Sequence, residues 1–273
     1  MLVLGVLALV HLAAFFLYTR RERQSQLLTQ YLDARDQWKA GHLDAAAREY
    51  REVLAGRAAA AWPLVLVRGF PDAASGWFVL GRVESERGDT DAALGAFEHA
   101  MAIDASRGRR EYRDLLLDSG RGAALAAFAR AELARDPASA LAAKDLGAAL
   151  LATGEPRAAA DAYQLALALL PAYLVRHDPA AAAAGLSSQE ADLLNLLSVA
   201  TRLAGDRARA DALCDALARR QPRGTRLDRL CRAYARADGG DPAGARQELA
   251  GYQPPAPEHE ALAAALGARL GEH

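Results

Sequence analysis

A recurring spacing of glycines constrains this chain most. Residues 77–100 read WFVLGRVESERGDTDAALGAFEHA and residues 145–171 read DLGAALLATGEPRAAADAYQLALALLP. In both segments a first glycine, a turn glycine, an alanine and a large aromatic follow one another at the same intervals: Gly81, Gly88, Ala93 and Phe97, then Gly147, Gly154, Ala159 and Tyr163. Such self-similarity predicts helix-turn-helix units that bury their apolar faces against their neighbours.

The turn glycines indicate how many units there are. They lie at Gly41, Gly88, Gly120, Gly154, Gly205 and Gly240. Most intervals are close to 34 residues, and the two longer ones predict insertions near 61–73 and 174–190. Six units are therefore expected, over residues 27–60, 74–107, 108–139, 140–173, 191–224 and 226–259. The third is the weakest, because it lacks the first glycine and its Phe128 is out of phase. Pro171 is expected to end the second helix of its unit.

On these residues the chain resembles the tetratricopeptide repeat (TPR) family. The resemblance implies an all-α solenoid of about six repeats over residues 27–259, followed by a capping helix and tail in 258–273 that shields the last repeat from water. A first glycine against a large aromatic implies close approach of the two helices in each repeat.

In that family ligands bind the concave groove lined by the first helix of each repeat. The matching positions here alternate between aromatic and cationic side chains, which suits a peptide with apolar anchors and some acidic character. The alternative is that several of them only contact the next repeat. The predicted groove residues are Tyr31, Arg35, Trp38, Phe78, Arg82, Lys144, Leu151, Asn195, Arg202 and Tyr234.

The N-terminal segment reads as a membrane anchor. Residues 1–18, MLVLGVLALVHLAAFFLY, contain no Asp, Glu, Lys or Arg, and as a helix they span roughly 27 Å, close to the thickness of a bilayer core. We expect a transmembrane helix over 1–19 and a basic juxtamembrane segment over 20–26. An uncharged start and the absence of a small-residue cleavage site disfavour the alternative of a removed signal peptide.

Charge predicts the orientation of this anchor. Arg20, Arg21 and Arg23 follow the apolar segment and no basic residue precedes it, so the repeats are expected in the cytoplasm, with the periplasm as the alternative. No Gly or Pro occurs between the apolar segment and Gly41. The span is therefore expected to continue as one helix into the first repeat.

The first insertion is unusually apolar. It carries Trp62, Leu64 and Phe70, which solvated loops rarely do. Packing over the first repeat and contact with the bilayer or a partner protein are the two alternatives. The three arginines after the span are candidates for the same membrane or partner contact.

The sequence lacks the elements of a catalytic or cofactor site. No phosphate-binding glycine loop or HExxH motif occurs, and the six histidines lie outside metal-ligand spacing and are mostly expected in solvent. Cys214 and Cys231 lie on helices expected to be neighbours. We expect them as two small unpaired core residues, with a disulfide as the alternative. A net charge of -1 offers no bulk attraction for nucleic acid.

Together these features predict a non-catalytic scaffold without a cofactor. It would assemble or hold a protein complex at a bacterial inner membrane, binding membrane proteins or peptide segments. Anchored repeat proteins of similar layout include assembly factors for cytochrome c, pili and secreted polysaccharides. Those that regulate lipopolysaccharide synthesis carry a four-cysteine module that is absent here. The alternative is a permanent accessory subunit that stabilises a membrane enzyme complex. The carboxylate clamp of chaperone-binding relatives needs several Asn and Lys, whereas this chain has only Asn195, Lys39 and Lys144.

Overall fold

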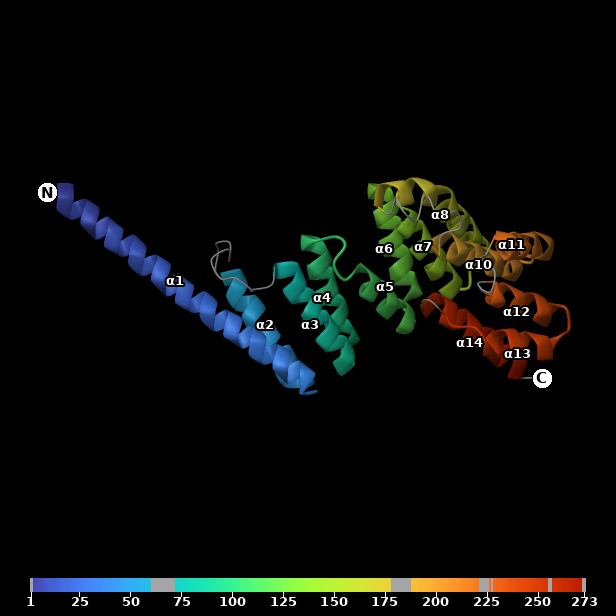
Figure 1. Cartoon of the computed structure of the whole chain (residues 1–273), viewed down its shortest axis with the longest axis horizontal. Helices are drawn as coiled ribbons and strands as arrows, with labels where there is room; N and C mark the ends of the chain where they lie inside the picture. The colour runs from blue at the N-terminus through green and yellow to red at the C-terminus, as the bar shows by residue number, and fades with distance from the viewer. Residues whose placement is uncertain are drawn as a thin grey trace. The chain divides into compact units, whose positions relative to one another are not determined.

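Helices are the only regular secondary structure in the part of the chain that the computed structural model describes, residues 2–59, 72–177, 188–220, 226, 228–254 and 257–271 (Figure 1). The chain divides into two compact units, Met1–Leu115 and Leu116–His273. The division falls inside the third predicted repeat, the one whose sequence pattern is weakest.

The N-terminal unit consists of two helix pairs and the start of a third. Its helices are α1 (Leu2–Lys39), α2 (Leu43–Ala59), α3 (Ala73–Arg87), α4 (Thr90–Ile103) and most of α5 (Arg109–Asp118). The predicted insertion residues Trp62, Leu64 and Phe70 lie outside the described residues.

Helix α1 runs without a break from the apolar N-terminal segment into the first helix pair. Its 38 residues correspond to roughly 57 Å of helix. The prediction of one continuous helix is thus confirmed. Its C-terminal part packs on α2 and α3 in a core that includes Ala34, Tyr50 and Leu80. The first pair and the N-terminal segment therefore share one rigid element.

The glycine and aromatic pairs behave as the repeat pattern predicts. A Cβ atom on Gly81 would lie 2.6 Å from the ring of Phe97, which is 1% exposed. On Gly147 it would lie 2.7 Å from the ring of Tyr163, which is fully buried. Only glycine allows this approach of the paired helices. The six turn glycines of the sequence pattern all have a positive φ, for example 83° at Gly88, where the backbone N–H closes the C-terminus of α3.

The C-terminal unit continues the helix pairs and adds one more helix. After the end of α5 it contains α6 (Gly122–Arg135), α7 (Ala140–Ala152), α8 (Pro156–His177), α10 (Ser188–Leu203), α11 (Arg207–Arg220), α12 (Arg229–Asp238), α13 (Pro242–Ala250) and α14 (Pro257–Gly271). Helices α7, α8 and α10 share one core. A second core joins α12 and α13 to Leu266 and Leu270 of α14.

Pro171 does not end its helix, so that prediction is wrong. Helix α8 continues through Pro171 to His177. Leu170 and Leu174, on either side of the proline, are both buried in the core shared with α10. Burial of these leucines offsets the backbone hydrogen bond that a proline inside a helix removes.

The two cysteines are joined rather than free, which corrects the expectation of unpaired thiols. Cys214 on α11 and Cys231 on α12 form a disulfide, with Cα atoms 5.9 Å apart. Their helices are neighbours, as the repeat pattern predicts. The bond therefore crosslinks the fifth helix pair to the sixth.

One helix among the described residues is long and apolar enough to cross a membrane by length and composition. It is the Pro156–Val175 part of α8, in which an 18-residue window has a mean hydropathy of 1.4 and is 39% buried. Because its Ala159, Tyr163 and Ala166 belong to the repeat core, it is explained as a core helix. The predicted N-terminal span stays a prediction, since most of its side chains lie outside the described residues.

Candidate functional site

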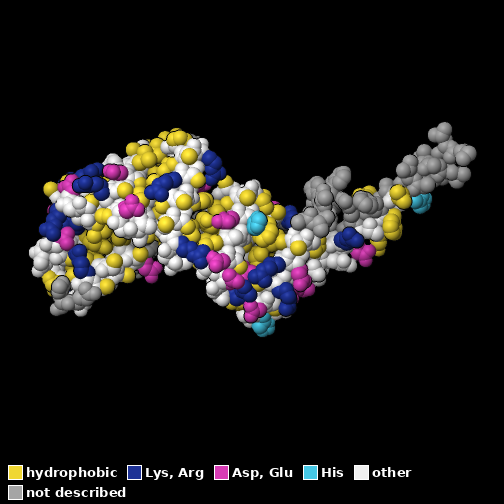
Figure 2. Space-filling model, turned by 180° about the vertical axis from the view of Figure 1, so that it is seen from behind, with side chains coloured by type: hydrophobic (Ala, Val, Ile, Leu, Met, Phe, Trp, Pro, Cys, Tyr) yellow, Lys and Arg dark blue, Asp and Glu magenta, His cyan; other side chains and the backbone are white. Residues whose placement is uncertain are grey.

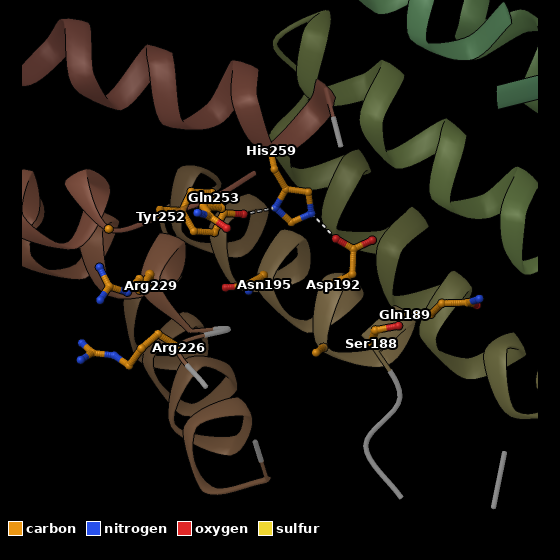
Figure 3. A pocket seen from close by; sticks show the side chains of 11 residues that line it. Ser188, Gln189, Asp192, Asn195, Arg226, Arg229, Tyr252, Gln253 and His259 are labelled. Atoms are coloured by element: carbon orange, nitrogen blue, oxygen red, sulfur yellow. Dashed lines mark hydrogen bonds and ion pairs between the residues drawn. The ribbon is translucent and has the colours of Figure 1, made fainter. Parts of the chain in front are cut away.

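A pocket of about 440 Å³ opens in the C-terminal unit where α10, the start of α12, the segment after α13 and α14 meet (Figure 3). Two arginines lie on one side of it and an aspartate-histidine pair on the other. Its lining is rich in amide and hydroxyl groups: Ser188, Gln189, Ala191, Asp192, Asn195, Arg226, Arg229, Gly251, Tyr252, Gln253 and His259.

A buried histidine links three segments at this pocket. His259, the third residue of α14, is 1% exposed. Its Nε2 is hydrogen-bonded to the carboxylate of Asp192 on α10, and its Nδ1 lies 2.6 Å from the hydroxyl of Tyr252 (Figure 3). The expectation that the histidines lie mostly in solvent is wrong for this residue, because Asp192, 67 positions away, and Tyr252 satisfy its ring inside the fold.

Lysine and glutamate extend the network along the first helices of the repeats. The ammonium group of Lys144 on α7 pairs with Asp192 and lies 3.1 Å from the buried carboxylate of Glu258 on α14. One ammonium group and two carboxylates therefore meet where α7, α10 and α14 come together. An ion pair and a hydrogen bond thus connect the start of α14 to α7 and α10.

The network sets the protonation of its acidic member. Burial alone raises the pKa of Asp192, but the hydrogen bond with His259 and the charge of Lys144 outweigh it and lower the pKa to about 2. Burial raises the pKa of Tyr252, and the carboxylates of Asp192 and Glu258 add to that effect. The phenol therefore stays protonated at neutral pH and is not an activated nucleophile.

Helix α14 lies across first helices of several repeats. Besides its contacts with α7 and α10, it accepts a hydrogen bond at the carbonyl of Leu262 from the hydroxyl of Tyr234 on α12, 2.9 Å away. Arg269 near its C-terminus pairs with Asp238 of α12 at 3.0 Å. The predicted capping helix therefore does more than cover the last repeat, because its first turn also contacts α7 and α10, the first helices of the two preceding repeats.

A second pocket, of about 460 Å³, lies between α14 and the first helices of two earlier repeats. Leu117 and Asp118 of α5 and Ala148, Leu151 and Ala152 of α7 line one side. Helix α14 lines the other with Glu258, Glu260, Ala261, Leu262, Ala264 and Ala265. Helix α14 thus leaves an unfilled space beside α5 and α7.

In the N-terminal unit the corresponding first helices form an aromatic and charged cluster. The guanidinium of Arg82 on α3 lies 5.0 Å from the ring centre of Trp38 on α1. The indole N–H of Trp38 donates to Glu86 at 2.7 Å, and Glu86 lies 3.7 Å from Arg82. Arg82 and Glu86 are about half exposed. Two adjacent first helices therefore present a tryptophan, a cation and an anion at one surface.

The remaining predicted groove residues have varied surroundings. Tyr31 packs edge-on against Tyr50, with ring centres 5.2 Å apart, and Arg35 pairs with its neighbour Asp36 at 3.3 Å. Phe78 packs against Phe97 at 6.1 Å. These side chains are partly covered by their own unit, as the alternative of contact between repeats allows.

In the C-terminal unit the predicted groove residues lie close to α14 or inside the fold. Lys144, Leu151 and Tyr234 line or contact α14, and Asn195 lines the first pocket. Arg202 is buried and pairs with Asp211 and Asp238, so its guanidinium is not on an accessible surface.

The candidate membrane-contact residues are only partly described. Arg21 and Arg23 are exposed on α1. For Arg20 only the helical backbone is described. A contact of these arginines with lipid or with a partner stays a prediction.

The sequence did not predict four residues of the network: Asp192, Tyr252, Glu258 and His259. Asp192 and His259 are 67 positions apart, and no local pattern connects them. The available signal was the apolar period of residues 262, 266 and 270, which indicates a helix buried along one face. It does not indicate what the acidic first turn of that helix contacts. Among the described residues no group of three or more His, Cys, Asp or Glu side chains could hold a metal ion.

Comparison with known proteins identifies no family for the chain: no family model matches, and no curated protein matches. Solved structures resemble it at low identity. The MamA protein is 17% identical, with 72% of this chain and 92% of that one covered and a TM-score of 0.45. A tetratricopeptide repeat protein from Parabacteroides merdae is 14% identical, with 92% and 100% covered and a TM-score of 0.43. PilF of Pseudomonas aeruginosa is 14% identical, with 89% and 99% covered and a TM-score of 0.46.

Identities and TM-scores this low carry no inference about what the chain binds. The class of protein follows instead from the chain's own packing. Helix pairs closed by left-handed turn glycines, with Gly81 against Phe97 and Gly147 against Tyr163, pack as the repeat pattern of the sequence predicts, in the manner of helical repeat proteins.

Proposed function

We propose that this protein is a membrane-anchored, non-catalytic interaction scaffold that assembles or holds a protein complex at a bacterial inner membrane. The observation that carries the proposal is helix α1, which joins the apolar N-terminal segment to the first helix pair without a break. A repeat domain attached in this way stays close to the bilayer, whereas a flexible linker would let it move away.

Exposed apolar side chains on α1 support the anchor. Leu12 is 70% exposed and Phe15 is 68% exposed, and Leu17 and Tyr18 are similarly uncovered. Figure 2 shows hydrophobic side chains along this part of α1, next to the end that is not described. Water disfavours such a continuous apolar surface, and a bilayer would cover it.

The first helices of the repeats supply the interaction surfaces. The Trp38, Arg82 and Glu86 cluster offers an apolar ring with both signs of charge, the combination that often anchors protein partners. The C-terminal unit offers two pockets beside α14. These features support binding to protein segments, and no catalytic step is proposed for them.

Two features favour opposite sides of the membrane for the repeats. The arginines after the apolar segment favour the cytoplasm, whereas the Cys214–Cys231 disulfide favours the oxidising periplasm. Protease added outside spheroplasts decides between them. Protected repeats would support the cytoplasmic orientation, and digested repeats would support the periplasmic one.

Membrane fractionation tests the anchor. The double variant Leu12→Arg and Phe15→Arg is expected to move from the membrane to the soluble fraction, because two charges inside a short span oppose insertion. Leu32→Arg is the matched control, since Leu32 is exposed on the same helix beyond the apolar segment. A double variant that still requires detergent for extraction would contradict the proposed anchor.

Gentle detergent extraction of the native protein, followed by size separation and mass spectrometry, tests the scaffold. Variable partners below one copy per chain would support a scaffold that assists assembly. Partners that remain at fixed stoichiometry would indicate a permanent accessory subunit. A chain that copurifies with no protein after mild crosslinking would contradict both functions.

A further inference from the structure

Helix α14 occupies the surface that the repeat geometry offers to a ligand. Its N-terminus contacts α7 and α10, its middle contacts α12, and it lines a pocket with the end of α5. These are the first helices of four successive repeats. A segment of the chain itself thus lies where a partner helix would bind.

The contacts of α14 fall into a polar end and an apolar stripe. At the polar end, Glu258 approaches Lys144 and His259 is bonded to Asp192. Along the stripe, Leu262, Leu266 and Leu270 recur every four residues, and the latter two are buried. Helix α14 is therefore amphipathic, with a carboxylate in its first turn and leucines along one side, of which Leu266 and Leu270 pack with α12 and α13.

This helix fits the groove incompletely. The side that it turns toward α7 carries Ala261, Ala264 and Ala265, which are exposed, and a space of about 460 Å³ remains there. A helix with larger apolar side chains at these three positions would bury more surface against Leu117, Ala148 and Leu151.

The polar end can be released without leaving a buried charge unpaired. Lys144 and Asp192 also pair with each other, so they remain matched when Glu258 and His259 move away. The cost of opening the groove is therefore lower than that of separating a buried ion pair into single charges.

We propose that α14 can be displaced from the groove formed by α5, α7, α10 and α12, and that this groove binds an amphipathic helix of a partner protein. That partner helix has an acidic residue in its first turn, leucines four residues apart, and apolar side chains larger than alanine facing α7. The inference rests on the proposed function as an interaction scaffold and names the class of partner. The resident helix would lower the apparent affinity for partners until one of sufficient affinity replaces it.

Binding of synthetic peptides to the full chain in detergent tests the inference. One labelled peptide copies residues 257–271, and a second carries Ala261→Leu, Ala264→Leu and Ala265→Leu. Fluorescence anisotropy is expected to show that the leucine peptide binds at least about tenfold more tightly than the parent peptide, because it fills the space beside α7. Equal affinity of the two peptides, or binding of neither, would overturn the inference.

A variant of the chain tests displacement separately. Glu258→Gln with His259→Ala removes the polar end of the resident helix, so the leucine peptide is expected to bind this variant at least about tenfold more tightly than the unmodified chain. Asp161→Asn is the matched control, because Asp161 is an exposed carboxylate on α8 that lines neither pocket, and it should bind like the unmodified chain. Helicity and the denaturation midpoint show that the variant is folded.

Two further outcomes would overturn the inference. A variant that binds the peptide no more tightly than the control would mean that α14 does not compete for the groove. A variant that forms dimers by light scattering would mean that a second copy of the chain is the occupant. Neither outcome would affect the proposed scaffold if copurifying partners remain in the detergent extract.

Discussion

The two units use the same repeat packing but present their first helices differently. In the N-terminal unit Trp38, Arg82 and Glu86 contact one another at the surface. In the C-terminal unit the corresponding helices lie against α14, which reaches Lys144 and Tyr234. The C-terminal unit therefore has one additional helix over its first helices, whereas the Arg82 and Glu86 side chains of the N-terminal unit stay about half exposed.

The largest expected effect tests whether the two units share one core design. Phe97→Ala in the first and Tyr163→Ala in the second should each lower the free energy of unfolding by about 3–5 kcal/mol, since each ring is buried against a glycine. Chemical denaturation followed by circular dichroism measures both. A decrease in the free energy of unfolding of less than about 1 kcal/mol in either variant would show that the two units do not share this packing.

The glycines that face these rings should also respond alike. Gly81→Ala and Gly147→Ala place a methyl group too close to Phe97 and Tyr163, so each should cost about 1–3 kcal/mol of stability. Gly95→Ala is the matched control, because no atom lies within 4 Å of its added Cβ, and it should gain roughly 0.5–1 kcal/mol. If all three variants behaved alike, the close helix approach would not matter.

The free energy of unfolding of the C-terminal unit should fall in acid because of Asp192. Its pKa falls on folding from 3.8 to about 2, so its contribution to stability is complete above about pH 4 and is lost as the pH falls toward 2. The contribution at neutral pH is roughly 2 kcal/mol.

Asp192→Asn should remove this part of the acid dependence in denaturation midpoints taken at several pH values. The comparison is Asp72→Asn in the N-terminal unit, which should remove a separate part of the acid dependence and keep the helix cap. The pKa of Asp72 is lowered mainly by the backbone N–H of Ser75 that it caps, and asparagine caps a helix as well as aspartate does. A variant with the acid profile of the unmodified chain would show that Asp192 is not bound in this network.

The smallest effect concerns the exposed cluster of the N-terminal unit. Arg82→Ala removes a cation over Trp38 and a partly exposed ion pair with Glu86, so stability should change by less than about 1 kcal/mol. The same variant should still reduce copurification of any partner that binds this surface. A stability loss above about 2 kcal/mol would show that the cluster supports the fold instead.

Local patterns made much of the fold predictable. The turn glycines have left-handed backbone, Gly81 and Gly147 meet aromatic rings, and α1 is continuous, because each feature depends on residues close in the sequence. The course of α8 through Pro171 was missed, since burial of Leu170 and Leu174 outweighs a local breaking signal.

The site was less predictable than the fold. Its network joins Lys144, Asp192 and His259, which come from three helices, and no spacing rule connects them. The spacing of apolar residues predicted a terminal helix after the last repeat. The surface that this helix covers depends on tertiary contacts of its first turn, which no local pattern indicates. The predicted groove residues lie on first helices, and their role in binding stays a prediction.

Hydrogen exchange on the full chain tests most directly whether α14 is a removable occupant. The amides of residues 257–271 should exchange faster than those of α12 and α13, because local opening of α14 leaves the repeats folded. Adding the leucine peptide should increase the difference. Protection of α14 equal to that of α12 and α13, unchanged by the peptide, would show that α14 opens only when the unit unfolds and would contradict a displaceable occupant.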